Sequence, residues 1–269
     1  MKNANCTVVV CSCDKYADLL DPFLTLFHKY WPDCPFELTL VTESSPDLHG
    51  SESFDRIIAC GPGGTWSSRL VKAIDQISTP YVLMLCDDYY LNQAVDTQLI
   101  LKRLDQIIRH GAANLRMIPN PKPGAGNTVG QVEDLYEYKK NTAYCVATQA
   151  GFWAKDFLRR LAASSASIWE FERFGSFSVS DDPRPLLVTP TKEFPFLDAV
   201  HKGHWEKFGV ACLRENNIEF DFSKRGLPPF KVRLVEGVKG LIFAIVPNTW
   251  IVRIQNALNL GAKESVKHV

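Results

Sequence analysis

Apolar and polar positions along the first 118 residues alternate between two periodicities. Continuous apolar or period-2 runs predict strands at 7–13, 36–42, 56–60, 81–86 and 113–118. Apolar residues at helical spacing predict helices at 16–30, 66–77 and 96–109. Strands that alternate with helices are typical of an α/β fold, so we expect a mostly parallel central sheet flanked by helices.

The pattern is less regular after residue 118. A Pro/Gly/Asn-rich segment, 119–130, predicts a long loop. Beyond it the sequence predicts strands at 142–148 and 218–222 and helices at 155–163 and 198–216. No domain boundary is evident before about residue 224.

Composition excludes several classes of protein. The chain has 269 residues, is 46% hydrophobic, and balances 30 Lys+Arg against 30 Asp+Glu. These values exclude a disordered or collagenous chain, and the neutral charge argues against a nucleic-acid partner. No apolar run reaches 18 residues, and residues 1–5 show no signal-peptide pattern, so we expect a cytoplasmic protein. The eight cysteines show no zinc spacing and are interpreted as reduced core residues.

The adjacent carboxylates Asp87 and Asp88 follow the most apolar predicted strand. In parallel α/β sheets, ligands bind beyond the carboxyl ends of the strands. Carboxylate oxygens placed there suit a hard divalent cation, which would in turn neutralise a diphosphate. The competing interpretation is a polar strand end that caps the next turn.

A second candidate is Trp169-Glu170-Phe171-Glu172, where two carboxylates alternate with aromatic residues. A carboxylate beside apolar rings is suited to act as a general base. The alternative is an amphipathic stretch with two solvated glutamates. His201 and His204, three residues apart on the expected helix, are interpreted as exposed helix residues rather than metal ligands.

Residues 224–269 carry eight Lys+Arg and two Asp+Glu, a net charge of +6, interleaved with apolar residues. This composition is compatible with a segment that lies on an anionic membrane surface, or with an ordinary C-terminal helix.

The order of these motifs resembles the GT-A glycosyltransferases that build bacterial surface polysaccharide, such as capsule, O-antigen and lipopolysaccharide. The resemblance rests on LMLCDDYYL after a Trp-led helix (WSSRLVKAIDQI), on QAGFWAKDFLRRL and SIWEFERFGS, and on DAVHKGHWEKFGVACLRENNIEFD. It implies a Rossmann-like catalytic domain over 1–225, with a donor half at 1–118 and an acceptor half at 119–225. Residues 226–269 would form a C-terminal basic amphipathic extension.

The resemblance also implies roles for individual residues. Asp87 and Asp88 would hold a divalent cation, Mg²⁺ or Mn²⁺, and the donor diphosphate. Either Glu170 or, as we favour, Glu172 would deprotonate the acceptor hydroxyl. The residues that would contact the rest of the donor are Cys11, Ser12, Cys13, Asp14, Trp66 and Arg69. The usual acidic motif is Asp-x-Asp, whereas here the second position after Asp87 is Tyr89, which puts strict metal dependence in question.

The sequence therefore predicts an enzyme that transfers a sugar from a nucleotide sugar to a glycan or lipid-linked glycan, with inversion. It would be cytoplasmic, with 226–269 as a peripheral contact to the inner membrane face. Two alternatives remain. One is a nucleotidyltransferase acting on sugar phosphates, although CSCDKY lacks the glycines that such enzymes often carry. The other is a non-catalytic sugar- or partner-binding module.

Overall fold

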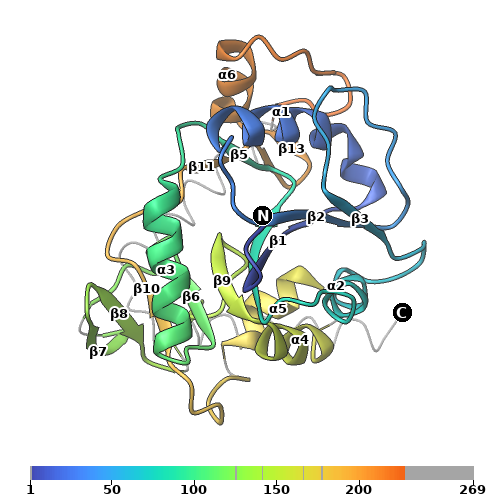
Figure 1. Ribbon diagram of the computed structural model, residues 1–269. Helices are drawn as coiled ribbons and strands as arrows, with labels where there is room; N and C mark the ends of the chain where they lie inside the picture. Colours follow the sequence, from blue (N-terminus) through green and yellow to red (C-terminus); the bar gives the residue numbers. More distant parts are fainter. Residues whose placement is uncertain (1, 125, 141, 166, 177, 228–269) are drawn as a thin grey trace.

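The structure is a computed structural model that describes residues 2–227, except 125, 141, 166 and 177. Its centre is a nine-stranded mixed sheet (Figure 1). In spatial order the strands are β3 (Arg56–Ala59), β2 (Glu37–Thr42), β1 (Cys6–Cys11), β4 (Tyr81–Cys86), β9 (Gly151–Ala154), β6 (Asn114–Arg116), β10 (Leu186–Val188), β8 (Leu135–Tyr138) and β7 (Thr128–Val132). Strands β8 and β9 run opposite to the other seven. The expected α/β class with a mostly parallel sheet is confirmed.

The helices form two layers, one on each face of the sheet, and alternate side chains of the central strands pack against each layer. Val8 and Val10 of β1 belong to one apolar cluster and Val9 to the other, because successive side chains of a strand point to opposite faces. The first cluster includes residues of α1 (Leu20–Tyr30) and α3 (Thr97–Arg109). The second includes α2 (Trp66–Ile74), α4 (Lys155–Ala163) and α5 (Ile168–Gly175), which lie together below the sheet in Figure 1.

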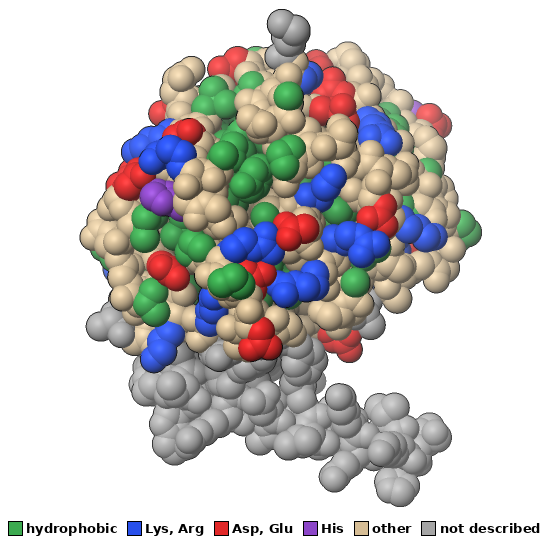
Figure 2. Space-filling view, turned by 60° about the horizontal axis from the view of Figure 1, so that its bottom comes forward, with side chains coloured by type: hydrophobic (Ala, Val, Ile, Leu, Met, Phe, Trp, Pro, Cys, Tyr) green, Lys and Arg blue, Asp and Glu red, His purple; other side chains and the backbone are tan. Residues whose placement is uncertain are grey.

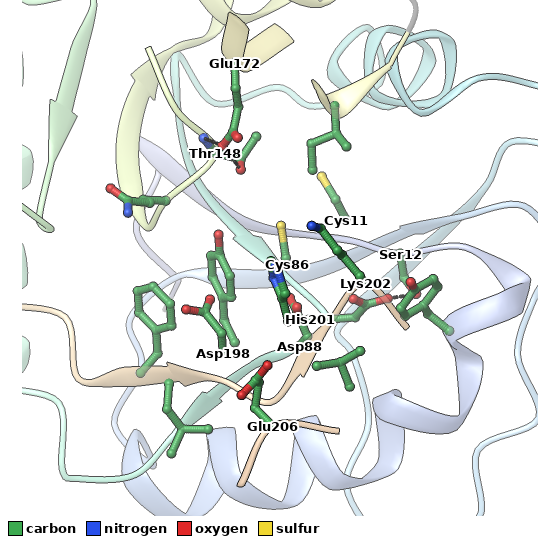
Figure 3. Close-up of a pocket in the computed structure, with 18 of the residues that line it drawn as sticks. Cys11, Ser12, Cys86, Asp88, Thr148, Glu172, Asp198, His201, Lys202 and Glu206 are labelled. Atoms are coloured by element: carbon green, nitrogen blue, oxygen red, sulfur yellow. Dashed lines mark hydrogen bonds between the residues drawn. The ribbon is translucent and has the colours of Figure 1, made fainter. Parts of the chain in front are cut away.

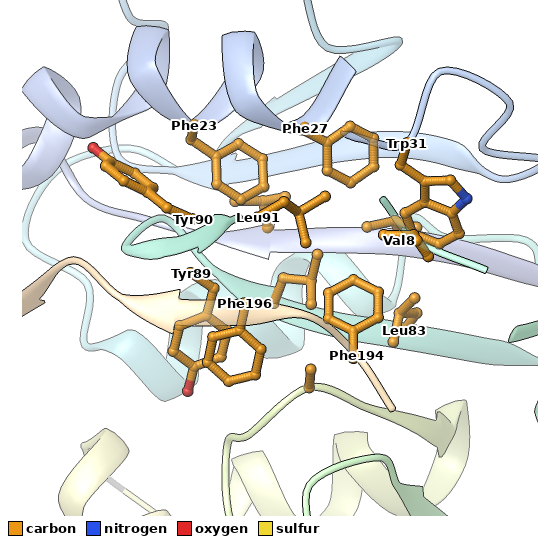
Figure 4. Packing of buried hydrophobic residues seen from close by; sticks show 14 of the residues in the cluster. Val8, Phe23, Phe27, Trp31, Leu83, Tyr89, Tyr90, Leu91, Phe194 and Phe196 are labelled. Carbon is orange, nitrogen blue, oxygen red and sulfur yellow. The ribbon is translucent and has the colours of Figure 1, made fainter. Parts of the chain in front are cut away.

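Smaller elements complete the fold above the sheet. Strand β5 (Tyr89–Leu91) pairs antiparallel with β11 (Phe196–Asp198), and β12 (Val200–His201) forms a hairpin with β13 (His204–Trp205). A short 3₁₀ helix, η1 (Asp14–Leu19), follows β1, and α6 (Lys207–Glu215) follows the hairpin. The rings of Tyr89 and Phe196 stack 4.1 Å apart and fix β11 on β5 (Figure 4).

Three local predictions are wrong. Residues 142–148 form turns instead of a strand, and 218–222 contain no strand. The helix expected at 198–216 begins only at Lys207, so His201 and His204 lie opposite each other in a β-hairpin. The strand expected at 81–86 and the helix expected at 155–163 occur with the expected ends, and the remaining expected elements occur with shifted ends.

Among the described residues, no helix is long and apolar enough to cross a membrane. The proposed membrane contact at 226–269 lies almost entirely outside the described residues, which end at 227. On the face shown in Figure 2, basic and acidic side chains are interspersed and neither sign forms a continuous patch.

Candidate functional site

A cleft of about 1090 Å³ opens at the carboxyl ends of β1 and β4. The chain continues from β1 to β2 and β3 on one side and returns to β4 on the other, so this is the point where the strand order reverses. Loops leave neighbouring strands in opposite directions there and separate to form a crevice. The position of the site therefore follows from the topology of the sheet.

The first wall of the cleft joins the ends of these two strands. Ser12, directly after β1, donates a 2.6 Å hydrogen bond from Oγ to Oδ2 of Asp87, directly after β4. Both side chains are buried. Burial raises the pKa of Asp87 to about 7, although the hydrogen bond from Ser12 and the positive charge of Arg225 oppose the rise.

Helix α2 supplies the second wall. Thr65 caps the helix by accepting a hydrogen bond from the backbone N–H of Ser68, and one turn later Arg69 faces the cleft. Arg69 Nη1 donates to Glu43 Oε1 at 2.8 Å and to the carbonyl oxygen of Gly64 at 2.7 Å. Trp66 also lines the cleft, with its ring 5.3 Å from that of Phe171 in an edge-to-face arrangement. The cationic and aromatic groups of this wall are thus held rigidly.

The pairing of β5 with β11 brings a second carboxylate to Asp88. Asp198 is opposite Tyr89 in that pair, and the backbone N–H of Ala199 donates to the carbonyl oxygen of Asp88 at 2.8 Å. Burial and the charges of Asp87 and Asp198 raise the pKa of Asp88 well above its usual range. Asp198 is open to the cleft, yet the surrounding walls displace water and raise its pKa as well.

Glu172 enters the cleft from the opposite side, on α5 (Figure 3). Its Oε1 accepts hydrogen bonds from the backbone N–H of Thr148 at 2.9 Å and from the hydroxyl of Thr148 at 2.6 Å. Glu170, two residues earlier, is exposed and does not line the cleft. The helix therefore separates the two glutamates that the sequence left as alternatives.

The β12–β13 hairpin forms the remaining side. Its two-residue turn has positive φ at both Lys202 (50°) and Gly203 (80°), as a tight hairpin turn requires. His201 and Lys202 line the cleft, and Glu206, just after the hairpin, faces the same space as Asp198 (Figure 3). Nε2 of His201 is buried and has no hydrogen-bond partner among the described residues.

Two carboxylates of the cleft could serve as cation ligands. Asp88 and Asp198 bring two hard oxygen donors together, and a cation would relieve the repulsion between them. Within the described part of the chain, no three His, Cys or carboxylate side chains are grouped closely enough to hold a metal ion by themselves. A cation held here by two carboxylates would need further ligands, such as water or phosphate oxygens, which Mg²⁺ commonly takes.

Most of the residues expected at the donor site do line this cleft. They are Cys11, Ser12, Cys13, Trp66, Arg69, Asp87, Asp88 and, for the base, Glu172. Asp14 does not line it: its carboxylate accepts hydrogen bonds from the backbone and hydroxyl of Ser44. Glu170 also lies outside it.

Sequence reasoning missed Asp198, His201 and Glu206 as cleft residues. All three lie in a segment interpreted as helical, in which His201 was interpreted as an exposed helix residue and no local pattern marked Asp198 or Glu206. The pairing of Asp198 with Tyr89, which no local signal shows, brings this segment to the site.

No protein-family profile matches the sequence, and no curated protein matches it. Similar solved structures include residues 1–349 of TarS from S. aureus, with 15% identity, 69% of this chain and 60% of that chain covered, and a TM-score of 0.39. TarS 1–349 in complex with UDP-GlcNAc is 17% identical, with 78% of this chain and 65% of that chain covered and a TM-score of 0.40. A 2-C-methyl-D-erythritol 4-phosphate cytidylyltransferase from Thermus thermophilus is 12% identical, with 80% of this chain and 100% of that chain covered and a TM-score of 0.44. The chain thus spans less than two thirds of the TarS chains, and these likenesses concern general architecture.

Proposed function

We propose that the protein is a glycosyltransferase that uses a nucleotide-sugar donor. One observation carries the proposal: a single cleft at the strand-order reversal combines diphosphate-binding chemistry on one wall with a positioned carboxylate on the facing wall. The donor-side groups come from 11–88 and the carboxylate, Glu172, from α5.

The donor would lie along the β1–β4 end of the cleft. Cys11 to Cys13 would contact the nucleoside, and Arg69 would face the diphosphate. Asp88 and Asp198, with Asp87 held by Ser12, would hold a divalent cation there. Such a cation, when bound, stabilises the charge of the departing nucleoside diphosphate.

Glu172 is the proposed general base. In an inverting displacement, the acceptor oxygen forms a bond to the anomeric carbon while the bond from that carbon to the diphosphate oxygen breaks. The acceptor proton passes to the carboxylate of Glu172, on the side of the sugar opposite the leaving group. Thr148 holds one oxygen of Glu172 with two hydrogen bonds, so its orientation is fixed before the substrate binds.

The acceptor is proposed to be a glycan or lipid-linked glycan of bacterial surface polysaccharide. This finer assignment rests on the resemblance of the sequence motifs described above.

Two glutamates on one helix give a matched test. Glu172→Gln is expected to lower sugar transfer roughly 10²–10⁴-fold, because the proton acceptor is lost. Glu170→Gln should leave transfer nearly unchanged, since that side chain is exposed outside the cleft. Turnover is measured, with Mn²⁺ present, as nucleoside diphosphate released from UDP-, GDP- and dTDP-sugars and as CMP released from CMP-sugars.

Donor binding is followed in the same variants by thermal shift, because a ligand that binds only the folded state raises its melting temperature. Both variants should keep the shift given by the active nucleotide sugar. Equal activity of Glu172→Gln and wild type would refute the base assignment. Release of pyrophosphate from a nucleoside triphosphate plus a sugar phosphate would replace the proposal with a nucleotidyltransferase.

A further inference from the structure

Two exposed aromatic side chains lie at the rim of the cleft. Trp169, on α5, is 55% exposed, and Phe208, at the start of α6, is 76% exposed. Both line the cleft, whereas the other large apolar residues exposed in the described chain do not: Ile57, Ile108, Val129, Phe222 and Leu227. Exposed aromatic rings concentrated at a cleft, rather than scattered, indicate a binding surface.

Neither ring is needed to hold its helix on the core. Helix α5 packs through Phe171, which is fully buried against Trp66 and Trp153. Helix α6 packs through a different set of residues, Gly209, Val210, Cys212 and Leu213. Each helix therefore has a complete buried face and presents an additional aromatic residue to the cleft.

Carboxylates accompany these rings. Asp198 and Glu206 line the same cleft, and their charges interact. Flat apolar rings beside hydrogen-bond acceptors match a pyranose, which has an apolar face of C–H groups and an equatorial rim of hydroxyls. A hydrocarbon chain would match the rings but would leave the carboxylate of Glu206 desolvated and without a hydrogen-bond donor, which is costly.

We propose that Trp169 and Phe208 form the acceptor subsite, in which a pyranose ring of the acceptor stacks on aromatic side chains while its hydroxyls bond to Glu206. The proposal rests on the proposed transferase function and specifies its acceptor as the sugar portion of the molecule. Trp169 is three residues from Glu172 on α5, so it lies about one helical turn from the proposed base.

The test is ligand-observed saturation-transfer NMR on the full chain. The probes are methyl β-glucoside, methyl β-galactoside and methyl N-acetyl-β-glucosaminide, with acyclic sorbitol as the polyol control and farnesyl phosphate as the lipid arm. At least one glycoside should receive saturation at its ring C–H groups, and sorbitol should not. Trp169→Ala and Phe208→Ala should each weaken glycoside binding roughly 3–10-fold.

Matched variants separate a subsite from a general loss of structure. Trp169→Tyr should restore most of the binding, and Phe222→Ala, which removes an exposed ring outside the cleft, should change nothing. No glycoside response, a response to farnesyl phosphate alone, or equal binding by Trp169→Ala and wild type would overturn the subsite.

The nucleotide thermal-shift panel reads out the transferase proposal independently. Nucleotide binding without glycoside binding would remove the subsite and leave the transferase standing. Glycoside binding without nucleotide binding would remove the transferase proposal and leave a sugar-binding site at these rings.

Discussion

Burial and charge conflict at Asp87. The residue is 7% exposed, its carboxylate accepts a hydrogen bond from Ser12, and its pKa is raised to about 7. An ionised group in this position is destabilising unless a positive partner is present. The residue is therefore suited to a site that a cation occupies during function.

This conflict predicts a pH dependence of stability. Because the folded-state pKa lies above the unfolded value near 4, the unfavourable contribution of Asp87 is absent below about pH 4, grows as pH rises to about 7, and is constant above. In EDTA, wild type should thus lose stability relative to Asp87→Asn between pH 4 and pH 7. Urea unfolding of both proteins at several pH values measures this difference in the free energy of unfolding. A constant difference across this range would contradict the burial of Asp87 as a costly charge.

At the scale of elements, α6 packs directly against the backbone of Ala199, the residue that follows Asp198. A side chain at Gly209 would place its Cβ 2.6 Å from the carbonyl oxygen of Ala199 and 2.7 Å from its Cα. Only glycine permits this approach of helix to strand, although glycine is a poor helix former. The close contact keeps the Asp198 segment against the cleft.

Gly209→Ala should therefore destabilise the protein by about 1–3 kcal/mol, since the helix must move away from Ala199. Helix propensity alone predicts the opposite sign, about 1 kcal/mol of stabilisation. Lys207→Ala, exposed in the same helix, is the control and should change little. Chemical denaturation gives both values, and a Gly209→Ala variant more stable than wild type would show that α6 is not seated in this way.

Across the whole molecule, the end of the described chain is tied to its beginning. Arg225 donates from Nε and Nη2 to the two carboxylate oxygens of Asp18, at 2.9 and 2.7 Å, and its guanidinium lies 4.2 Å from the centre of the Tyr16 ring. Arg225 is 5% exposed, so this ion pair is shielded from water. Tyr16 lines the cleft, so this contact of Arg225 with Asp18 and Tyr16, here called the clamp, borders the proposed donor site.

A double-mutant cycle measures this clamp. Arg225→Ala and Asp18→Asn should each destabilise the protein, and their coupling energy should be roughly 1–3 kcal/mol because the two side chains share one network. Arg225→Lys should recover only part of the stability, since an ammonium group does not reproduce the two-point contact. Additive single-variant effects in thermal unfolding would contradict the clamp.

The strands and helices that were predicted correctly have strong local signals. The apolar run that became β4 and the helical spacing that became α3 are fixed by residues adjacent in sequence. The segment at 142–148 has strand-like composition, but it pairs with no strand of the described residues and forms turns. At 198–205, pairing with β5 and a positive-φ turn at Lys202 and Gly203 override a helical pattern.

The candidate site shows the same division. The placement of polar residues after an apolar strand marked Asp87 and Asp88, because strand ends in a parallel sheet converge at one edge, whereas Ser12 was implied by the resemblance. Choosing Glu172 over Glu170 required the orientation of α5, since residues two apart in a helix point in different directions and only packing sets which of them faces the cleft. Asp198 and Glu206 reach the cleft through long-range pairing and had no sequence signal.

The sequence by itself determined the α/β class, the donor-side strand ends and the acidic and aromatic chemistry available to the protein. Those features depend on residue type and short-range periodicity, which are local properties of the sequence. The tertiary structure decided which carboxylates face one another, which aromatic rings stay exposed and which glutamate enters the cleft. Those features depend on contacts between segments far apart in sequence, because only packing sets the direction in which each side chain points.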